Sequence, residues 1–253
     1  MLQASFRATA AHYMVDAARL FSTDNPKASK AAAYGWHNAI HYMAHSTTAG
    51  VGNLCPSASA GCITICLGEH SGQAAIHAAG KDSQAITARK RRARMFMKDR
   101  AAYLAIIDAA IWRAKREARR LKLELCVRLN GSTDIPLLVD TAARNHPYVQ
   151  FTDYTKLVSR ALAHAAGKLP RNVSVTFSRS ETNEDDCRRV LAAGGNVAAV
   201  FAGALPATYL GAPVINGDLH DLRHLDPRGV VVDRKSTRLN SSHEVPSRMP
   251  SSA

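Results

Sequence analysis

Three cysteines lie within a short segment of this 253-residue chain, NLCPSASAGCITICLG. Cys62 and Cys66 are four residues apart, so a helical turn after Gly61 would place both sulfurs on one face. Cys55 can fold back towards them across the Pro-Ser-Ala-Ser-Ala-Gly bend. Thiolates are ligands of zinc and of iron–sulfur clusters. The spacing therefore predicts a three-thiolate metal site at Cys55, Cys62 and Cys66.

The remaining cysteines and the histidines add little to this site. Five cysteines in a chain of this length are sparse and odd in number, which does not favour a secreted disulfide framework. Cys126 and Cys187 are expected to be packing groups. A closed zinc site is the alternative to a cluster, with His70 or Cys126 as the fourth ligand. The 11 histidines show neither HExxH nor H-x3-H spacing, so none is predicted to be catalytic.

Strand and helix patterns alternate in the second half of the chain, which is typical of parallel βαβ units. Adding a first strand near AIHYMAH, before the cysteines, gives about six βα units. The expected fold is α/β, a partial or complete (β/α) barrel, with an open parallel sheet as the alternative. The expected strands are ELCVRLN, VQFTDY, NVSVTFS, NVAAVFA and GVVVD, and the expected helices are PLLVDTAARNH, YTKLVSRALAHAAG and EDDCRRVLAAGG.

The segment from residue 71 to 121 is predicted to be helical, with a break near Met97 and Asp99 as the cap of the second helix. Glycines at positions 167, 194 and 195 fall where helices should end. Residues 1–22 are expected to form a peripheral helix and residues 23–232 a single domain. One buried stripe is predicted from spacings of three and four, at Leu104, Ile107, Ile111, Ala114, Ala118 and Leu121.

Polar residues follow successive predicted strands. Active sites of parallel α/β folds gather at the carboxyl ends of strands, so on one rim these residues would line a single charged pocket. The alternatives are structural: a turn at Asn130-Gly131, a helix cap at Asp134, and surface ion pairs of Asp153 with Lys156 and of Arg179 with Glu181. The predicted catalytic residues are Asp153, Tyr154, Lys156, Arg179, Glu181, Asp218, Asp221 and Arg223, and the predicted cofactor-binding residues are Asn130, Gly131, Ser132, Asp134 and Ser178.

The chain is strongly basic, with a formal net charge of +13. Two expected helices carry most of this charge on their faces. Such a face is either simply solvated or a stripe that follows the phosphates of DNA or RNA. No helix-turn-helix, zinc-finger or RNP motif accompanies it. The predicted nucleic-acid contacts are Arg89, Lys90, Arg91, Arg92 and Arg94, and the second helix adds Arg113, Lys115, Arg116, Arg119, Arg120 and Lys122.

No apolar run approaches the roughly 18 residues that a membrane-spanning helix needs. The first twenty residues lack a secretory pattern, and although they contain few acids, as transit peptides do, a peripheral helix is favoured. We therefore expect a cytoplasmic protein without membrane contact.

The tail from Asp233 onward reads DRKSTRLNSSH, EVP and SRMPSSA, without hydrophobic periodicity. It resembles a translated sequencing-library adapter, in which Glu244, Val245 and Pro246 would be the index codons. The alternative is a disordered Ser-rich tail. Without the tail's four basic and two acidic residues, the net charge is still +11.

Eight motifs together resemble an uncharacterised family of phage and prophage proteins, over about Leu20 to Val232. The resemblance implies a phage-encoded protein in the host cytoplasm but no particular activity. The motifs are NPKASK, CPSASAGCITICL, VRLNGSTDIP, VQFTDYTK, VTFSRSETN, AAGGNVAAVF, LPATYLGAPVINGD and DLRHLDPRG.

A three-cysteine loop after the first strand of a six-unit α/β barrel also resembles the radical S-adenosylmethionine superfamily. The resemblance implies a [4Fe-4S] cluster on Cys55, Cys62 and Cys66. It implies that residues 130–132 receive the amino group of S-adenosylmethionine and that residues 178–181 lie near its ribose. The spacing here is C-x6-C-x3-C rather than C-x3-C-x2-C, and a Gly-Gly-Glu motif is missing.

Two functions are therefore expected from the sequence. The first is an iron–sulfur enzyme of radical type with an unidentified substrate. The second is a zinc-stabilised, nucleic-acid-binding phage protein.

Overall fold

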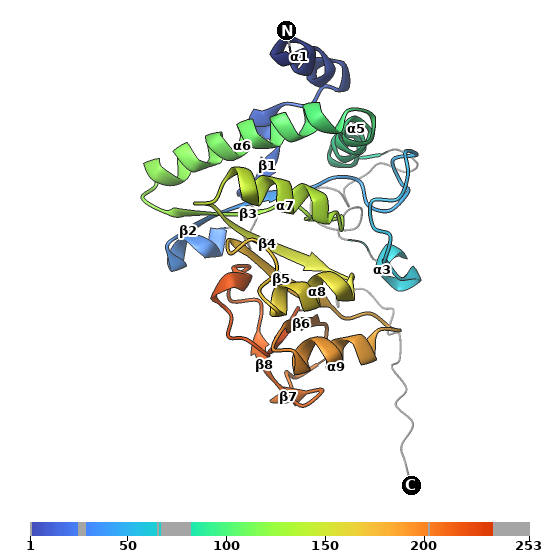
Figure 1. Ribbon diagram of the computed structural model, residues 1–253, viewed down its shortest axis with the longest axis vertical. Helices are drawn as coiled ribbons and strands as arrows, with labels where there is room; N and C mark the ends of the chain where they lie inside the picture. The colour runs from blue at the N-terminus through green and yellow to red at the C-terminus, as the bar shows by residue number, and fades with distance from the viewer. Residues whose placement is uncertain (1, 25–28, 65, 67–81, 202, 235–253) are drawn as a thin grey trace.

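A computed structural model describes residues 2–24, 29–64, 66, 82–201 and 203–234. Its helices and strands alternate along most of the chain (Figure 1). The helices are α1 (Leu2–Tyr13), α3 (Ala60–Thr64), α5 (Gln84–Lys98), α6 (Arg100–Arg120), α7 (Pro136–Asn145), α8 (Val158–Ala165) and α9 (Glu184–Ala192), with short 3-10 turns η1 (Ala17–Arg19), η2 (Ala31–Tyr34) and η4 (Arg223–Leu225). The strands are β1 (Phe21–Ser22), β2 (Trp36–His41), β3 (Glu124–Arg128), β4 (Gln150–Thr155), β5 (Val173–Ser178), β6 (Asn196–Ala199), β7 (Thr208–Tyr209), β8 (Ala212–Asn216) and β9 (Val231–Asp233).

The strands form one mixed sheet in the order β1-β2-β3-β4-β5-β6-β9-β8-β7. The seven strands from β2 to β8 in this order pair in parallel, and β1 and β7 add antiparallel pairs at the two ends. The predicted α/β class is confirmed. Because β1 and β7 do not pair with each other, the sheet is open, and the open-sheet alternative describes it rather than a complete barrel.

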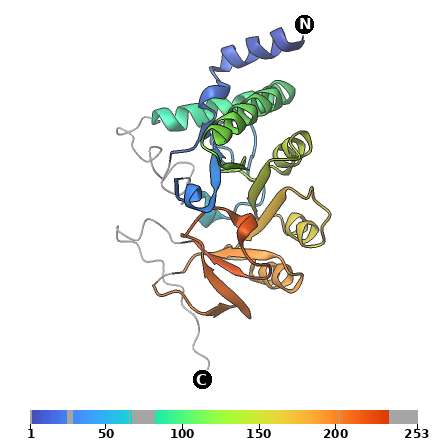
Figure 2. The same ribbon diagram turned by 90° about the vertical axis from the view of Figure 1, so that its left-hand side faces the viewer.

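The crossover helices lie on one face of this sheet. Strands β2 to β6 are neighbours in chain order, and right-handed connections between sequential parallel strands place every helix on the same side. Figure 2 shows the helices at the middle and end of the chain along one side of the strands. Phe151, Val173 and Val175 point towards these helices and are buried in the main hydrophobic core. Alternation along each strand therefore sends the intervening side chains to the opposite face.

That opposite face is polar. It carries Cys126, Arg128, Thr152, Tyr154 and Thr176, all of them buried. The turn η4 packs against β4 and β5 and covers this face. The sheet thus has one apolar face under the helices and one polar face under a loop segment.

The break between the two long helices is confirmed at Asp99. Its Oδ1 accepts a hydrogen bond of 2.9 Å from the Ala102 backbone, so the carboxylate caps α6. The buried stripe differs from the prediction at its ends, because Leu121 follows the helix in a turn and is 41% exposed, and Leu104 is only half-buried. The buried residues of α6 are Ala102, Tyr103, Ile106, Ile107, Ala110, Ile111, Ala114 and Ala118.

Several predicted elements have different bounds. The first parallel strand begins at Trp36, earlier than the predicted AIHYMAH, and β7 and β8 were not predicted. Asp233 pairs within β9, so the sheet extends one residue past the predicted boundary at Val232. Pro136 starts α7 as predicted, but its N-cap is Ile135 rather than Asp134. The helical prediction for 71–81, and the tail from 235, lie outside the described residues.

Within the described part of the chain, no helix is long and apolar enough to cross a membrane.

Candidate functional site

The cysteine loop follows β2 and lies against the carboxyl end of β3. The Asp134 backbone donates a hydrogen bond of 2.9 Å to the Leu54 carbonyl. The Cys55 thiol lies 3.5 Å from the carbonyl of Ser132, to which it donates. Figure 1 shows α3 on the side of the sheet to which the arrow of β4 points. The part of the loop that contains Cys55 is therefore held at the carboxyl ends of the parallel strands, where active sites of parallel α/β folds lie.

A second attachment joins the loop to the end of β5. The Glu181 carboxylate accepts hydrogen bonds from the Ser59 hydroxyl at 2.8 Å and from the Gly61 backbone at 2.9 Å. These bonds, together with one from its own backbone N–H, hold the pKa of Glu181 below its usual range. Glu181, predicted to be catalytic, thus fixes the start of α3 in this structure.

We expect Glu181→Ala to loosen the cysteine loop without unfolding the protein, because both bonds lie at the surface. Amide hydrogen exchange in 58–64 should accelerate by roughly tenfold, which corresponds to the loss of about one hydrogen bond. Glu184→Ala is the matched control, since Glu184 is an exposed acid of α9 that pairs with Arg179 and Arg188 rather than with the loop. Equal exchange in both variants would show that Glu181 does not hold the loop.

The three predicted metal ligands are half-exposed cysteines that form no disulfide in the described part of the chain. Burial raises the pKa of Cys55 to about 11, and the neighbouring charges of Asp134 and Cys62 act in the same direction. Cys66 continues the turn after α3, with its backbone N–H donating to Ile63. Among the described residues, no three His, Cys, Asp or Glu side chains form a group that could hold a metal ion. The predicted three-thiolate site therefore stays a prediction.

Of the two residues predicted as a fourth zinc ligand, the structure describes only Cys126, and it does not place Cys126 at the cysteine loop. Cys126 is buried in β3, where its sulfur lies 3.8 Å from the Thr152 hydroxyl and 3.9 Å from Nδ1 of His224. Neither partner belongs to the cysteine loop. His70 lies outside the described residues. Cys187 is also buried, so both it and Cys126 occupy packing positions, as expected.

Asp134 ties the carboxyl ends of two neighbouring strands together. Its carboxylate accepts from the Thr155 hydroxyl at 2.9 Å and from the Lys156 backbone at 2.9 Å. Burial raises its pKa, while these hydrogen bonds oppose the rise. The Lys156 ammonium in turn donates to the carbonyl of Arg179 at 3.3 Å. These contacts link the ends of β3, β4 and β5 directly beneath the cysteine loop.

Asp153 belongs to a separate, buried network on the helix side of the sheet. It accepts from the Asn130 amide at 3.1 Å and from Nε of Arg160 at 3.3 Å. Arg160 also holds Asp140 through two bonds of 2.9 Å and 3.0 Å. Burial raises the pKa of Asp153 to about 7, although Arg160 acts against the rise. The predicted surface pair of Asp153 with Lys156 is wrong, because Asp153 is buried and forms its ion pair with Arg160.

Tyr154 faces the opposite side and joins a second buried cluster. Its hydroxyl donates to Asp221 at 3.1 Å, and Arg128 pairs with the same carboxylate at 3.1 Å. The guanidinium of Arg128 stacks over the Tyr154 ring at 4.5 Å. Arg223 pairs with Asp226 at 3.2 Å, and both side chains are almost fully buried. The predicted catalytic residues are thus divided between two faces of the sheet instead of lining a single pocket.

The predicted cofactor-binding residues at the end of β3 are occupied by internal contacts. The Asn130 amide also donates to Ile135, and its oxygen accepts from Thr133. The Ser132 hydroxyl donates to the Met43 carbonyl at 2.6 Å. A Cβ on Gly131 would lie 2.5 Å from the His41 carbonyl, so only glycine fits where this loop crosses the end of β2.

The remaining predicted residues lie at the rim. Ser178 ends β5, and its carbonyl accepts from the Asn183 amide at 3.0 Å. Arg179 pairs weakly with Glu184 at 3.7 Å, so its predicted pairing with Glu181 is wrong. Asp218 accepts through its backbone carbonyl from the Lys30 ammonium at 2.8 Å.

Four of the five predicted nucleic-acid contacts on α5 have partners inside the protein. Arg92 donates to the carbonyls of Tyr42 and Arg19, and Arg94 donates to the carbonyl of Ala49. Arg89 stacks over the Tyr42 ring, and Lys90 pairs with Asp82. This part of the basic run fixes α5 to the chain on either side of β2, which a charge pattern alone does not reveal.

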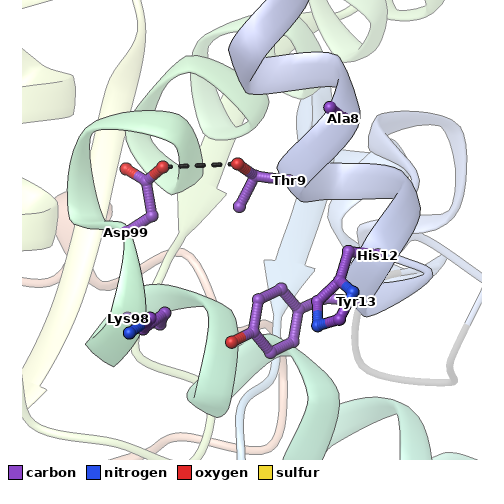
Figure 3. Close-up of a pocket in the computed structure, with 6 residues that line it drawn as sticks. All are labelled: Ala8, Thr9, His12, Tyr13, Lys98 and Asp99. Atoms are coloured by element: carbon purple, nitrogen blue, oxygen red, sulfur yellow. Dashed lines mark hydrogen bonds between the residues drawn. The ribbon is translucent and has the colours of Figure 1, made fainter.

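A surface hollow of about 430 Å³ lies elsewhere, between α1 and the corner of α5 and α6 (Figure 3). It is lined by Ala8, Thr9, His12, Tyr13, Lys98 and Asp99. The Thr9 hydroxyl donates to Asp99 at 3.4 Å across it. None of the predicted site residues lines this hollow, and we assign it no chemistry.

The residues missed by sequence reasoning are Arg160, Asp140, Arg128 and Ser59. A charged residue inside an apolar strand was the available signal for Arg128. Arg160 sits on a short amphipathic helix without a distinguishing pattern.

Together these features define an open α/β sheet protein with a cysteine loop fixed at its carboxyl edge. Residues 19–246 match the family described as Gene product 88, so the chain belongs to this phage gene-product family of unknown function. No curated protein and no solved structure matches the chain. The match includes residues 233–246, and it does not mark them as an adapter.

Proposed function

We propose that this protein is a phage-encoded iron–sulfur protein in which Cys55, Cys62 and Cys66 hold a [4Fe-4S] cluster. The observation that carries the proposal is the attachment of the cysteine loop to the ends of β3 and β5, through Ser132 and Glu181. A group bound there would lie at the edge where parallel sheets place their reacting groups.

The three side chains match a cluster chemically, because cysteine sulfurs are the usual ligands of iron–sulfur clusters and none of the three forms a disulfide in the described residues. Their positions do not yet form a ligand group in the described residues. Cluster binding therefore requires α3, a helix of five residues, to shift so that Cys62 and Cys66 approach Cys55. Such a shift disrupts little packing, since α3 has no buried residue, and it can pivot about the bonds that hold Ser59 and Gly61 to Glu181.

A bound cluster supplies one-electron transfer, and its thiolate ligands must lose their protons on binding. The protein's own residues have two tasks at this edge. Glu181 positions the start of α3, and the Lys156 ammonium places a positive charge between the ends of β4 and β5. That charge would favour an anionic substrate group next to the loop.

S-adenosylmethionine remains a separate prediction. The side chains of Asn130 and Ser132 are occupied by internal hydrogen bonds, so they would need to exchange partners to receive its amino group. Binding of this cofactor, measured by calorimetry on the cluster-loaded protein, would extend the proposal to the radical class.

The test is anaerobic purification followed by an absorption spectrum and metal analysis. We expect brown protein with broad absorption near about 400 nm. Cys62→Ala should lose this absorption and the iron, whereas Cys187→Ala, at a buried position in α9, should keep both. Colourless protein with stoichiometric zinc, or iron retained by Cys62→Ala, would contradict the proposal.

A further inference from the structure

One face of α6 presents an unusual combination of side chains. Trp112, Lys115, Arg116 and Arg119 follow the spacing of a single helical face. Trp112 is 57% exposed, and Tyr148, in the loop before β4, is 87% exposed. Exposed aromatic rings beside basic side chains are the combination by which proteins bind single-stranded nucleic acid. We call these five residues the Trp112 face.

Lys115 holds the two aromatic rings together. Its ammonium lies 5.5 Å from the centre of the Trp112 ring and 5.8 Å from the centre of the Tyr148 ring. Both distances are within the range of a cation–π contact. Two rings from different elements thus lie within cation–π range of one positive charge.

The charge of the Trp112 face is not neutralised locally. The nearby acid Asp108 contacts Nε2 of His146 at 3.0 Å rather than a basic side chain of this face, and Glu117 is paired with Arg120 at 2.6 Å. Within the described residues, neither Arg116 nor Arg119 forms an ion pair with a carboxylate. The face therefore keeps the charge of three basic side chains around its two rings.

We propose that the Trp112 face binds single-stranded nucleic acid. Bases can stack on Trp112 and Tyr148, while Lys115, Arg116 and Arg119 contact phosphates, which is how single strands are bound without sequence preference. This binding is independent of the cluster, because the end of α6 lies on the side of the molecule away from α3 (Figure 1).

A lipid surface fits this face less well. Helices that lie on membranes insert a continuous apolar face. The apolar stripe of α6, which includes Ile107 and Ile111, is buried in the core and is not available for insertion.

The experiment is a titration of the 253-residue chain with a labelled oligothymidylate of about fifteen nucleotides. We expect the Kd to weaken by roughly tenfold between 50 mM and 200 mM salt, from about two to three phosphate contacts. Trp112→Ala and Tyr148→Ala should each weaken binding by at least about fivefold, because each removes one stacking surface. In the wild-type protein, the oligonucleotide should also quench tryptophan emission, a signal that Trp112→Ala should lose.

Charge is tested with matched double variants. Arg116→Ala with Arg119→Ala should weaken binding and lower the salt dependence. Arg188→Ala with Arg189→Ala removes the same charge from the exposed face of α9 and should leave Kd within about twofold.

Three results would overturn the proposal. The first is unchanged affinity in both aromatic variants, which would indicate attraction by charge alone. The second is an equal effect of the two double variants. The third is saturable binding to vesicles of anionic lipid with none to the oligonucleotide. Cys62→Ala protein should bind the oligonucleotide normally, so failure of the cluster would not obscure this test.

Discussion

Arg160→Met is expected to destabilise the protein by about 3–5 kcal/mol, the range found when one partner of a buried ion pair is removed. The Arg160 side chain is 5% exposed and bridges two carboxylates, and that of Asp153 is fully buried. Methionine fills most of the volume but leaves the Asp153 charge without its guanidinium. Urea unfolding at pH 8, followed by circular dichroism, measures the loss.

Arg188→Met is the matched control for this substitution. Arg188 also forms an ion pair, with Glu184 at 2.9 Å, but its side chain is 55% exposed. Exposed pairs of this spacing contribute roughly 0.3–0.5 kcal/mol. Adding Asp153→Asn to Arg160→Met should recover part of the stability, because it removes the unpaired charge. No recovery, or a loss as small as that of Arg188→Met, would contradict the role of Arg160.

The effect of Arg160→Met should also depend on pH. Burial raises the pKa of Asp153 from 3.8 to about 7 in the folded protein, and loss of Arg160 should raise it further. A carboxyl group whose pKa is raised on folding contributes most below its unfolded pKa, and this contribution is lost as pH rises through the folded pKa. The stability gap between wild type and variant should therefore widen from pH 5 to pH 8.

The second large expected effect is a loss of folding stability at acidic pH, caused by protonation of His41. Its Nδ1 lies 2.7 Å from the Leu129 carbonyl, which can only accept, so Nδ1 donates and Nε2 accepts from the Tyr103 hydroxyl at 2.7 Å. Burial lowers the pKa of His41 to about 3, and the charge of Arg92 acts in the same direction. Protonation of His41 therefore destabilises the folded protein.

A histidine whose pKa is lowered on folding makes its full contribution to stability above its unfolded pKa of 6.5. That contribution is lost as the pH falls from 6.5 towards the pKa of the histidine in the folded protein. Between pH 6.5 and 4.5, His41 alone should remove about 2 kcal/mol. Urea midpoints measured across this range test the slope.

His41→Gln should be less stable at pH 7 but should lose this part of the acid slope. Tyr103→Phe removes the hydroxyl and keeps the titrating ring, so it should keep the slope. Equal slopes in wild type and His41→Gln would show that His41 does not cause the acid sensitivity.

Periodicity was sufficient to predict the α/β class, because the strands and helices after residue 121 are well separated by glycine and polar turns. It could not decide between barrel and open sheet. That choice depends on β1 and β7, which have two residues each and form the antiparallel ends. Strands this short carry no alternating pattern.

The candidate site was predictable in part. The residues that follow the predicted strands include Ser132 and Glu181, and both contact the cysteine loop in the structure. The sequence did not show that Asp153 and Tyr154 belong to different networks. Adjacent residues of a strand point to opposite faces of the sheet, but the sequence does not reveal which network lies on which face. Arg160 was missed because its partners come from two other elements.

We propose that the cysteine loop holds an iron–sulfur cluster. The most direct test is to count iron, acid-labile sulfide and zinc in one anaerobically reconstituted sample. We predict about four iron and four sulfide per chain in the wild-type protein. The triple variant Cys55→Ser, Cys62→Ser, Cys66→Ser should contain neither, while the double variant Cys126→Ser, Cys187→Ser should match the wild type. About one zinc per chain without sulfide, or iron retained by the triple variant, would contradict the claim.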